Sequence, residues 1–137
     1  MDTFLLFLTQ NYLAVTILLI AILALLMHET RRGGEKIEPS VATNLVNKQG
    51  GTLIDLRTKS EFDSGHISGS LNCEPSLEIE DVLSSKEKEN PIVLVCQNGS
   101  ASKHAGLKLK KLGFSKTYIM QSGIMGWKGQ GLPLVKE

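Results

Sequence analysis

A single cysteine stands between an apolar segment and a run of small polar residues. Cys96 directly follows Ile-Val-Leu-Val, and the next six residues are Gln97, Asn98, Gly99, Ser100, Ala101 and Ser102. Backbone N–H groups of such a loop can surround an anion, and a helix starting after it would aim its amino terminus at the sulfur. These features suit a thiolate nucleophile. Free cysteines at strand ends are, however, often only packing residues, so the local sequence leaves both interpretations open.

The second cysteine, Cys73, follows a short extended segment. Two cysteines are too few for a disulfide scaffold or a four-ligand zinc site. We interpret Cys73 as a small, half-buried packing residue. The alternative is a resolving thiol that forms a disulfide with Cys96 or receives sulfur from it, which would require the two sulfur atoms to approach each other.

Apolar runs alternate with helical patterns in the region that must position Cys96. The sequence predicts strands over 52–56, 92–96 and 116–120, an extended segment over 69–74, and helices over 39–49, 76–88 and 101–112, with one further helical turn before Gly65. Residues 122–134 are expected to form a short final helix that ends in a Gly-Pro turn. The run at 92–96 is apolar without alternation, which is typical of a strand covered on both faces. This order predicts an α/β fold with an open parallel sheet of four to five strands and helices on both faces.

The first 30 residues contain no Lys or Arg, and residues 12–27 are apolar except for Thr16. Residues 4–27 are long enough to cross a bilayer core, which takes roughly 20 residues, so we expect one transmembrane helix. A cleaved signal peptide should open with basic residues, and a soluble core helix should have a polar face. Neither feature is present in this segment.

The charges after the apolar segment predict its orientation. Arg31, Arg32 and Lys36 follow it and no basic residue precedes it, so the carboxyl-terminal part should face the cytoplasm from the inner membrane. We therefore expect an anchor over 1–30, a flexible linker over 31–36 and a domain over 37–137. The chain has 15 Lys and Arg against 14 Asp and Glu, a balance that gives no indication of nucleic-acid binding.

Three stretches of the expected domain together resemble the rhodanese-like domain family. Leu53–Asn72 contains Asp-x-Arg, Glu-Phe and Gly-His-Ile-x-Gly-x-x-Asn; Ile92–Ser102 contains Cys-x-x-Gly-x-x-Ser; and Leu112–Leu134 contains Leu-Gly-Phe, Gly-x-x-x-Trp and Gly-Leu-Pro. Each motif is weak alone, but their order and spacing are specific. The resemblance covers nearly all of residues 37–135, and the apolar segment before it is similar to that of membrane-anchored single-domain bacterial members.

The resemblance implies that Cys96 is the nucleophile of a sulfurtransferase and that the loop from Gln97 to Ser102 cradles the sulfur. Cys96 would take sulfane sulfur from a donor, hold it as a persulfide and pass it to a thiol acceptor. The resemblance implies no metal or organic cofactor. The alternative is a weakly active or inactive rhodanese-like module that binds a membrane or cytoplasmic protein partner.

One position departs from the family pattern. Many active members have Arg directly before the closing Ser of the loop, where this chain has Ala101. That guanidinium would bind an anionic donor, so we expect weak turnover of thiosulfate or a persulfide donor instead. Related phosphatases and arsenate reductases have Arg six residues after the cysteine. Ser102 occupies that position here, which disfavours phosphoryl transfer.

Several other ionisable or aromatic side chains lie near predicted strand and turn ends. In the family, the positions of Asp55, Arg57, Glu61 and His66 mostly brace the fold, and we expect the same role here. His66 is the least clear of the four because histidine titrates near neutral pH. Trp127 is expected to anchor the last helix in the core.

Overall fold

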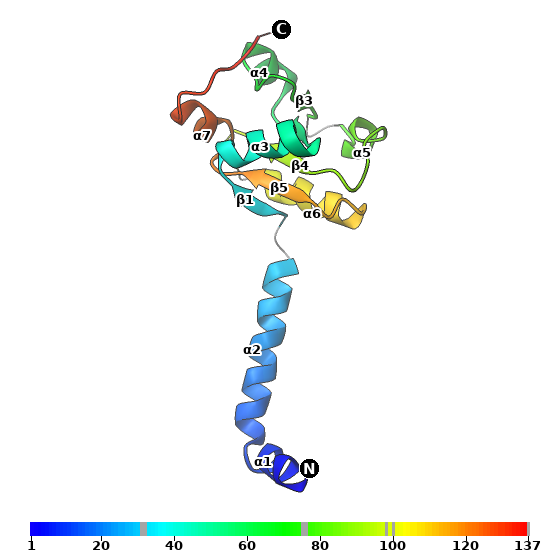
Figure 1. Cartoon of the computed structure of the whole chain (residues 1–137), viewed down its shortest axis with the longest axis vertical. Helices are drawn as coiled ribbons and strands as arrows, with labels where there is room; N and C mark the ends of the chain where they lie inside the picture. The colour runs from blue at the N-terminus through cyan, green and yellow to red at the C-terminus, as the bar shows by residue number, and fades with distance from the viewer. Residues whose placement is uncertain (31–32, 75–76, 98, 100, 137) are drawn as a thin grey trace. The chain divides into compact units, whose positions relative to one another are not determined.

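The computed structural model describes residues 1–30, 33–74, 77–97, 99 and 101–136 (Figure 1). The chain forms two compact units, Met1–Arg31 and Arg32–Glu137. Each unit has its own secondary structure, and the second contains all the strands of the described residues. The two candidate nucleophiles, Cys73 and Cys96, both belong to this second unit.

The second unit is built on a five-stranded parallel sheet with the strand order β1-β5-β4-β2-β3. Its strands are β1 (Glu35–Ile37), β2 (Thr52–Asp55), β3 (Leu71–Asn72), β4 (Ile92–Val95) and β5 (Thr117–Met120). Every paired neighbour is parallel, so all strands end at the same edge of the sheet. The predicted open parallel sheet is confirmed, with β4 as its central strand.

Helices cover both faces of the sheet. They are α3 (Pro39–Gln49), α4 (Lys59–Ser64), α5 (Ile79–Val82), α6 (Ser102–Lys111) and α7 (Gly123–Gly129). One core cluster joins side chains of α3 and α7 to one face of the sheet, and a second joins α5 and α6 to the other. The ribbon shows α3 and α6 on opposite sides of the strands (Figure 1).

The apolar run of β4 explains why both faces are covered. All four residues of this strand are buried. Val93 and Val95 point into the cluster with α3 and α7, whereas Ile92 and Leu94 point into the cluster with α5 and α6. Because side chains alternate along a strand, Cys96, two residues after Leu94, also belongs to the α6 side.

Helix boundaries follow local signals in the sequence. Pro39 occupies the start of α3, and Gly50 ends this helix in a left-handed conformation with φ of 68°. The backbone N–H groups of Thr58 and Glu61 at the start of α4 are satisfied by each other's side chains, in a reciprocal capping box. These boundaries agree with the predicted helices.

Two expectations about residues 31–88 differ from the structure. Residues 33–36 are not a free linker, because Gly33 and Gly34 are buried and Glu35 begins β1. Arg31 and Arg32, the rest of the expected linker, lie outside the described residues. The helix predicted over 76–88 is reduced to the four residues of α5, since the sequence after Leu83 has no apolar residue to hold another turn against the core.

The first unit contains two helices, α1 (Asp2–Gln10) and α2 (Tyr12–Thr30). The single continuous helix predicted for residues 4–27 is therefore not what the structure shows. Asn11 interrupts it, with its backbone and side-chain amides both donating to the carbonyl oxygen of Phe7. Within the described residues, no one helix is long and apolar enough to cross a membrane. Taken together, α1 and residues Tyr12–His28 of α2 are long and apolar enough, but the two helical segments are bent by 84° relative to each other.

Candidate active site

Cys96 is the first residue after the central strand β4, at the edge of the sheet where the parallel strands end. Open α/β sheets bind their ligands at this edge. The Cys96 side chain lies on the α6 side and is only 3% exposed. The sulfur thus sits between the end of the central strand and the start of the following helix.

Backbone N–H groups of the next residues point at this sulfur. The N–H of Gly99 donates to Sγ of Cys96 over 2.9 Å. Gly99 has a φ of 93°, a left-handed conformation that glycine adopts without strain and that returns the chain toward the sulfur. Of the residues expected to cradle the sulfur, Gly99, Ala101 and Ser102 direct N–H groups at Cys96, Gln97 is exposed, and Asn98 and Ser100 lie outside the described residues.

The environment of Cys96 favours the thiolate. Burial raises the pKa of its thiol, but the hydroxyl of Ser102 and the backbone N–H groups of Ser102, Ala101 and Gly99 lower it more, so the pKa lies below that of an ordinary cysteine. All of these donors come from the loop and the first residue of α6. The Ser102 hydroxyl and local backbone N–H groups, without any cationic side chain among these causes, therefore favour the thiolate.

Ser102 differs from the other residues around Cys96 because it acts on the thiol through its side-chain hydroxyl. The residue is fully buried, and its Oγ makes no hydrogen bond of ordinary geometry with the described part of the chain. The same hydroxyl is close enough to Cys96 to lower the pKa of the thiol. A buried hydroxyl without a regular partner is costly unless some group accepts a hydrogen bond from it, and an anionic sulfur is such an acceptor.

A second segment, from Ser122 to Ile124, supports the base of the loop. The N–H of Ile124 donates to the carbonyl oxygen of Cys96 over 2.8 Å. A Cβ atom on Gly123 would lie 2.1 Å from that same oxygen, and Gly123 has a φ of 54°. Gly123 was not among the predicted site residues, and the signal for it in the sequence is its place at the start of the Gly-x-x-x-Trp motif.

Cys73 lies at the same sheet edge but two strands away. It follows β3, its N–H donates to the carbonyl oxygen of Asp55 in β2, and Leu56 lies between it and Cys96 in the strand register. Two strand spacings amount to roughly 9 to 10 Å between Cα atoms, beyond the reach of a disulfide. Burial raises the pKa of Cys73, which favours its neutral thiol form. Both cysteines are free.

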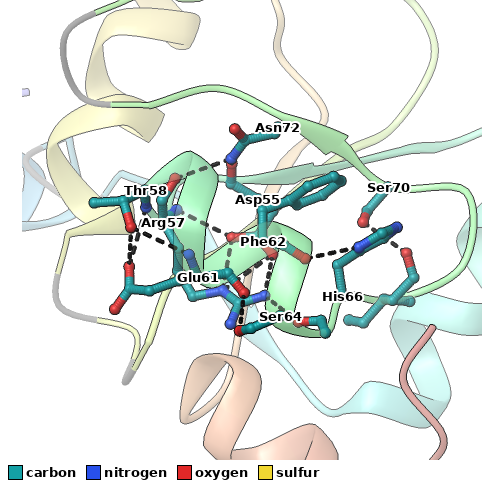
Figure 2. A network of polar contacts seen from close by, with 11 residues as sticks. Asp55, Arg57, Thr58, Glu61, Phe62, Ser64, His66, Ser70 and Asn72 are labelled. Carbon is teal, nitrogen blue, oxygen red and sulfur yellow. Dashed lines mark hydrogen bonds and ion pairs between the residues drawn. The ribbon is translucent and has the colours of Figure 1, made fainter. Parts of the chain in front are cut away.

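The remaining candidate residues form a polar network beneath the ends of β2 and β3 (Figure 2). The guanidinium of Arg57 holds the buried carboxylate of Asp55, with a shortest distance of 2.7 Å, and also donates to the carbonyl oxygen of Gly65. Glu61 caps α4, and the buried ring of His66 stacks on Phe62 and contacts its carbonyl oxygen at 2.8 Å. These contacts brace the chain, as expected for all four residues.

Two further observations complete the site. The indole N–H of Trp127 donates to the carbonyl oxygen of Pro133 over 2.9 Å while the ring packs in the core, so its predicted anchoring role is confirmed. No group of three or more His, Cys, Asp and Glu side chains that could hold a metal ion occurs among the described residues.

Comparison with known proteins identifies the fold. The sequence profile of the rhodanese-like domain matches residues 38–130. The chain belongs to the rhodanese-like domain family. This rhodanese-like domain superposes on a rhodanese-related protein from Thermoplasma volcanium with a TM-score of 0.62 and 27% identity, covering 75% of this chain and 99% of that one.

Two curated relatives show how far the similarity extends. "Thiosulfate sulfurtransferase GlpE" of Pseudomonas putida is 29% identical over 94 residues, 69% of this chain and 84% of the relative. "Uncharacterized protein YibN" of Escherichia coli is 33% identical over 121 residues, 87% of this chain and 85% of the relative. The second alignment is longer than the unit Arg32–Glu137, so it includes part of the N-terminal unit.

The rhodanese-like domain of this chain keeps the cysteine but has an unusual loop. Ala101, where Arg is common in the family, is exposed and immediately precedes α6. Its side chain is a methyl group and supplies no charge to a bound anion. The described groups that face the sulfur are backbone N–H groups and the Ser102 hydroxyl.

Proposed function

We propose that this protein is a sulfurtransferase that carries sulfane sulfur as a persulfide on Cys96 and passes it to a thiol acceptor. The observation that carries the proposal is the lowered pKa of Cys96 inside a cradle of backbone N–H groups. A persulfide is itself anionic, so the donors that favour the thiolate also suit the loaded state. Sulfurtransferase relatives in the same family support this reaction class.

Sulfur moves in two displacement steps that involve no net oxidation or reduction. The Cys96 thiolate attacks the outer sulfur of a donor R–S–SH; a new S–S bond forms, the donor S–S bond breaks, and R–S⁻ leaves with the electron pair. An acceptor thiolate then attacks the outer sulfur of the Cys96 persulfide. This second step gives the acceptor persulfide and regenerates the Cys96 thiolate.

The exposed methyl group of Ala101 favours a persulfide donor over thiosulfate. When thiosulfate gives up its outer sulfur, the leaving group is the doubly charged sulfite. Binding thiosulfate well therefore calls for a fixed cation such as a guanidinium. A protein or low-molecular-weight persulfide needs only the N–H cradle around its outer sulfur. We therefore expect turnover with persulfides to exceed turnover with thiosulfate.

Intact-mass measurement of the full chain after exposure to a persulfide donor tests the proposal. The wild-type protein should gain the mass of one sulfur atom, located on Cys96 by peptide mapping, and lose it on addition of a thiol. Cys73→Ser is the matched control and should behave as the wild type. If Cys96→Ser loads and releases sulfur as the wild type does, the proposal is wrong.

A second candidate function is a rhodanese-like binding module with little activity, in which Cys96 is incidental. The same residue, Ala101, favours it, because the missing guanidinium removes a usual binding group. This alternative predicts no persulfide with any donor. It also predicts a set of crosslinked protein partners that Cys96→Ser leaves unchanged.

We further propose that residues 4–27 attach the domain to the cytoplasmic face of the inner membrane. The large apolar side chains of α1 and α2 are mostly exposed in the described residues, which leaves them to be covered by lipid. The basic residues after α2 favour the cytoplasmic side. Full-length protein that remains in the soluble fraction of lysed cells would exclude attachment, and protease access from the outside of spheroplasts would exclude the orientation.

A further inference from the structure

Few large apolar side chains are exposed on the unit Arg32–Glu137. Among its described residues they are Val41, Leu77, Met125 and Val135. Met125 is 56% exposed, although its neighbour Ile124 is fully buried. Single exposed apolar side chains are common on soluble proteins, so exposure alone assigns no role to any of the four. The position of Met125 in the fold distinguishes it.

Met125 lies directly against the residue that follows the nucleophile. Its N–H donates to the carbonyl oxygen of Gln97 over 3.3 Å, next to the hydrogen bond between Ile124 and Cys96. The first turn of α7 follows β5, which is the neighbour of β4 in the sheet. This turn therefore borders the sheet edge at which a ligand reaches Cys96.

The exposed residues on both sides of the Cys96 loop are uncharged. Within the described part of the chain they are Gln97 and Ala101 of the loop and Gln121, Ser122 and Met125 of the segment after β5. Lys103 is the charged residue nearest to Ala101 along the chain, but two helical residues turn it about 200° around the axis of α6. The described surface beside the nucleophile is thus neutral, and Met125 is its one large apolar side chain.

We propose that Met125 selects thiol acceptors whose reactive cysteine is flanked by apolar side chains. This inference rests on the proposed sulfur transfer by Cys96. When the acceptor thiolate attacks the outer sulfur of the Cys96 persulfide, a new S–S bond forms, and the Cys96 thiolate leaves with the electron pair. An apolar side chain next to the acceptor sulfur can then pack on Met125, whose unbranched side chain adapts to differently shaped partners. A charged side chain there would meet no opposite charge among the five exposed residues.

Transfer of sulfur from the loaded full-length protein to two peptides tests this role of Met125. The peptides are Leu-Cys-Leu and Ser-Cys-Ser, both acetylated and amidated, so they present the same uncharged backbone and thiol with apolar or polar flanks. Cysteine persulfide loads Cys96, intact mass verifies the loading, and loss of the added sulfur gives a second-order rate constant for each peptide. We expect the leucine peptide to react about tenfold faster. The preference should persist at high salt, because an apolar contact is not screened.

Variants of Met125 locate the origin of the preference. Met125→Gln keeps the length of the side chain and should reduce the preference to about twofold or less, whereas Met125→Leu should retain it. Val41→Thr alters another exposed apolar residue, in the helix that follows β1, and should also retain it.

The outcomes separate this inference from the proposed function. Wild-type protein that forms no persulfide on Cys96 refutes the sulfur transfer and, with it, the role of Met125. Protein that is loaded but passes sulfur equally fast to both peptides refutes the selectivity and leaves the sulfur transfer standing. An unchanged preference in Met125→Gln, or an equal loss in Val41→Thr, also overturns the assignment to Met125.

Discussion

The backbone N–H of Gly99 donates to the sulfur of Cys96 over 2.9 Å, and this contact defines the geometry of the loop. It forms because Gly99 is left-handed, which turns the backbone after the strand back onto the side chain that ends it. Together with Ala101 and Ser102, it supplies an anion site made almost wholly of main chain. Such a site stabilises charge through main-chain N–H groups and one hydroxyl, without a cationic side chain among the causes of the lowered pKa.

The first prediction concerns the ionisation of Cys96. In Cys73→Ser protein, the ultraviolet absorbance of the thiolate should titrate at a lower pH in the folded chain than in the same chain unfolded in urea, because the cradle lowers the pKa. The folded pKa is the lower one, so ionisation adds stability that is fully present above the unfolded pKa, about 8.5, and is lost as pH falls through the folded pKa. A folded midpoint at or above the unfolded midpoint would contradict the cradle.

The second prediction isolates the hydroxyl of Ser102. Ser102→Ala should raise the pKa of Cys96 and slow persulfide formation about tenfold or more, as for loss of a hydrogen bond to a charged group. Its effect on unfolding should be small at pH values below the folded pKa of Cys96, where the thiol is neutral, because the hydroxyl makes no regular hydrogen bond to the described residues. Ser64→Ala, which removes an exposed hydroxyl bonded to the carbonyl oxygen of Glu61, is the control and should leave the titration unchanged.

The third prediction compares two glycines of α7. Gly123→Ala should destabilise the protein by about 1 to 3 kcal/mol or more and disturb the Cys96 loop, because the new Cβ would meet the Cys96 carbonyl oxygen in a left-handed backbone. Gly129→Ala places a Cβ where nothing lies within 4 Å and should change stability by less than about 1 kcal/mol. Equal unfolding midpoints for the two variants in urea would refute the contact.

The sequence was sufficient for the parts of this fold that are fixed locally. The continuous apolar run of β4 predicted a strand covered on both faces, and Pro39 and Gly50 marked the ends of α3. The loop motif predicted that Gly99 and Ser102 would surround Cys96. In each case, the type of residue determines the local backbone conformation of the residues next to it in the chain.

The parts that could not be predicted depend on contacts between distant segments. Glu35–Ile37 has one buried residue and becomes β1 only by pairing with β5. Gly123 contacts Cys96 through its backbone, which no side-chain pattern reveals. The break at Asn11 is, by contrast, local: it follows the polar run Thr9-Gln10-Asn11, and both amides of Asn11 donate to the carbonyl oxygen of Phe7.

The fourth prediction separates a buried ion pair from an exposed one. Asp55→Asn should destabilise the protein by about 3 to 5 kcal/mol, because it leaves the buried guanidinium of Arg57 without its carboxylate. Asp63→Asn removes the partner of Lys59 in an exposed pair and should cost less than about 1 kcal/mol. Chemical unfolding of both variants gives the comparison, and a similar loss in each would mean that the Asp55 network does not brace the fold.

The fifth prediction restores the missing charge. Ala101→Arg should raise kcat/KM for thiosulfate about tenfold or more, since an added guanidinium can form charge-assisted hydrogen bonds to the anionic donor. Residue 101 is exposed, so the longer side chain fits without displacing the core. Ala101→Met adds a side chain of similar length without charge and should leave thiosulfate turnover near that of the wild type. The gain with Arg should also shrink at high salt. If Arg and Met have the same effect, donor choice is set by something other than charge at this position.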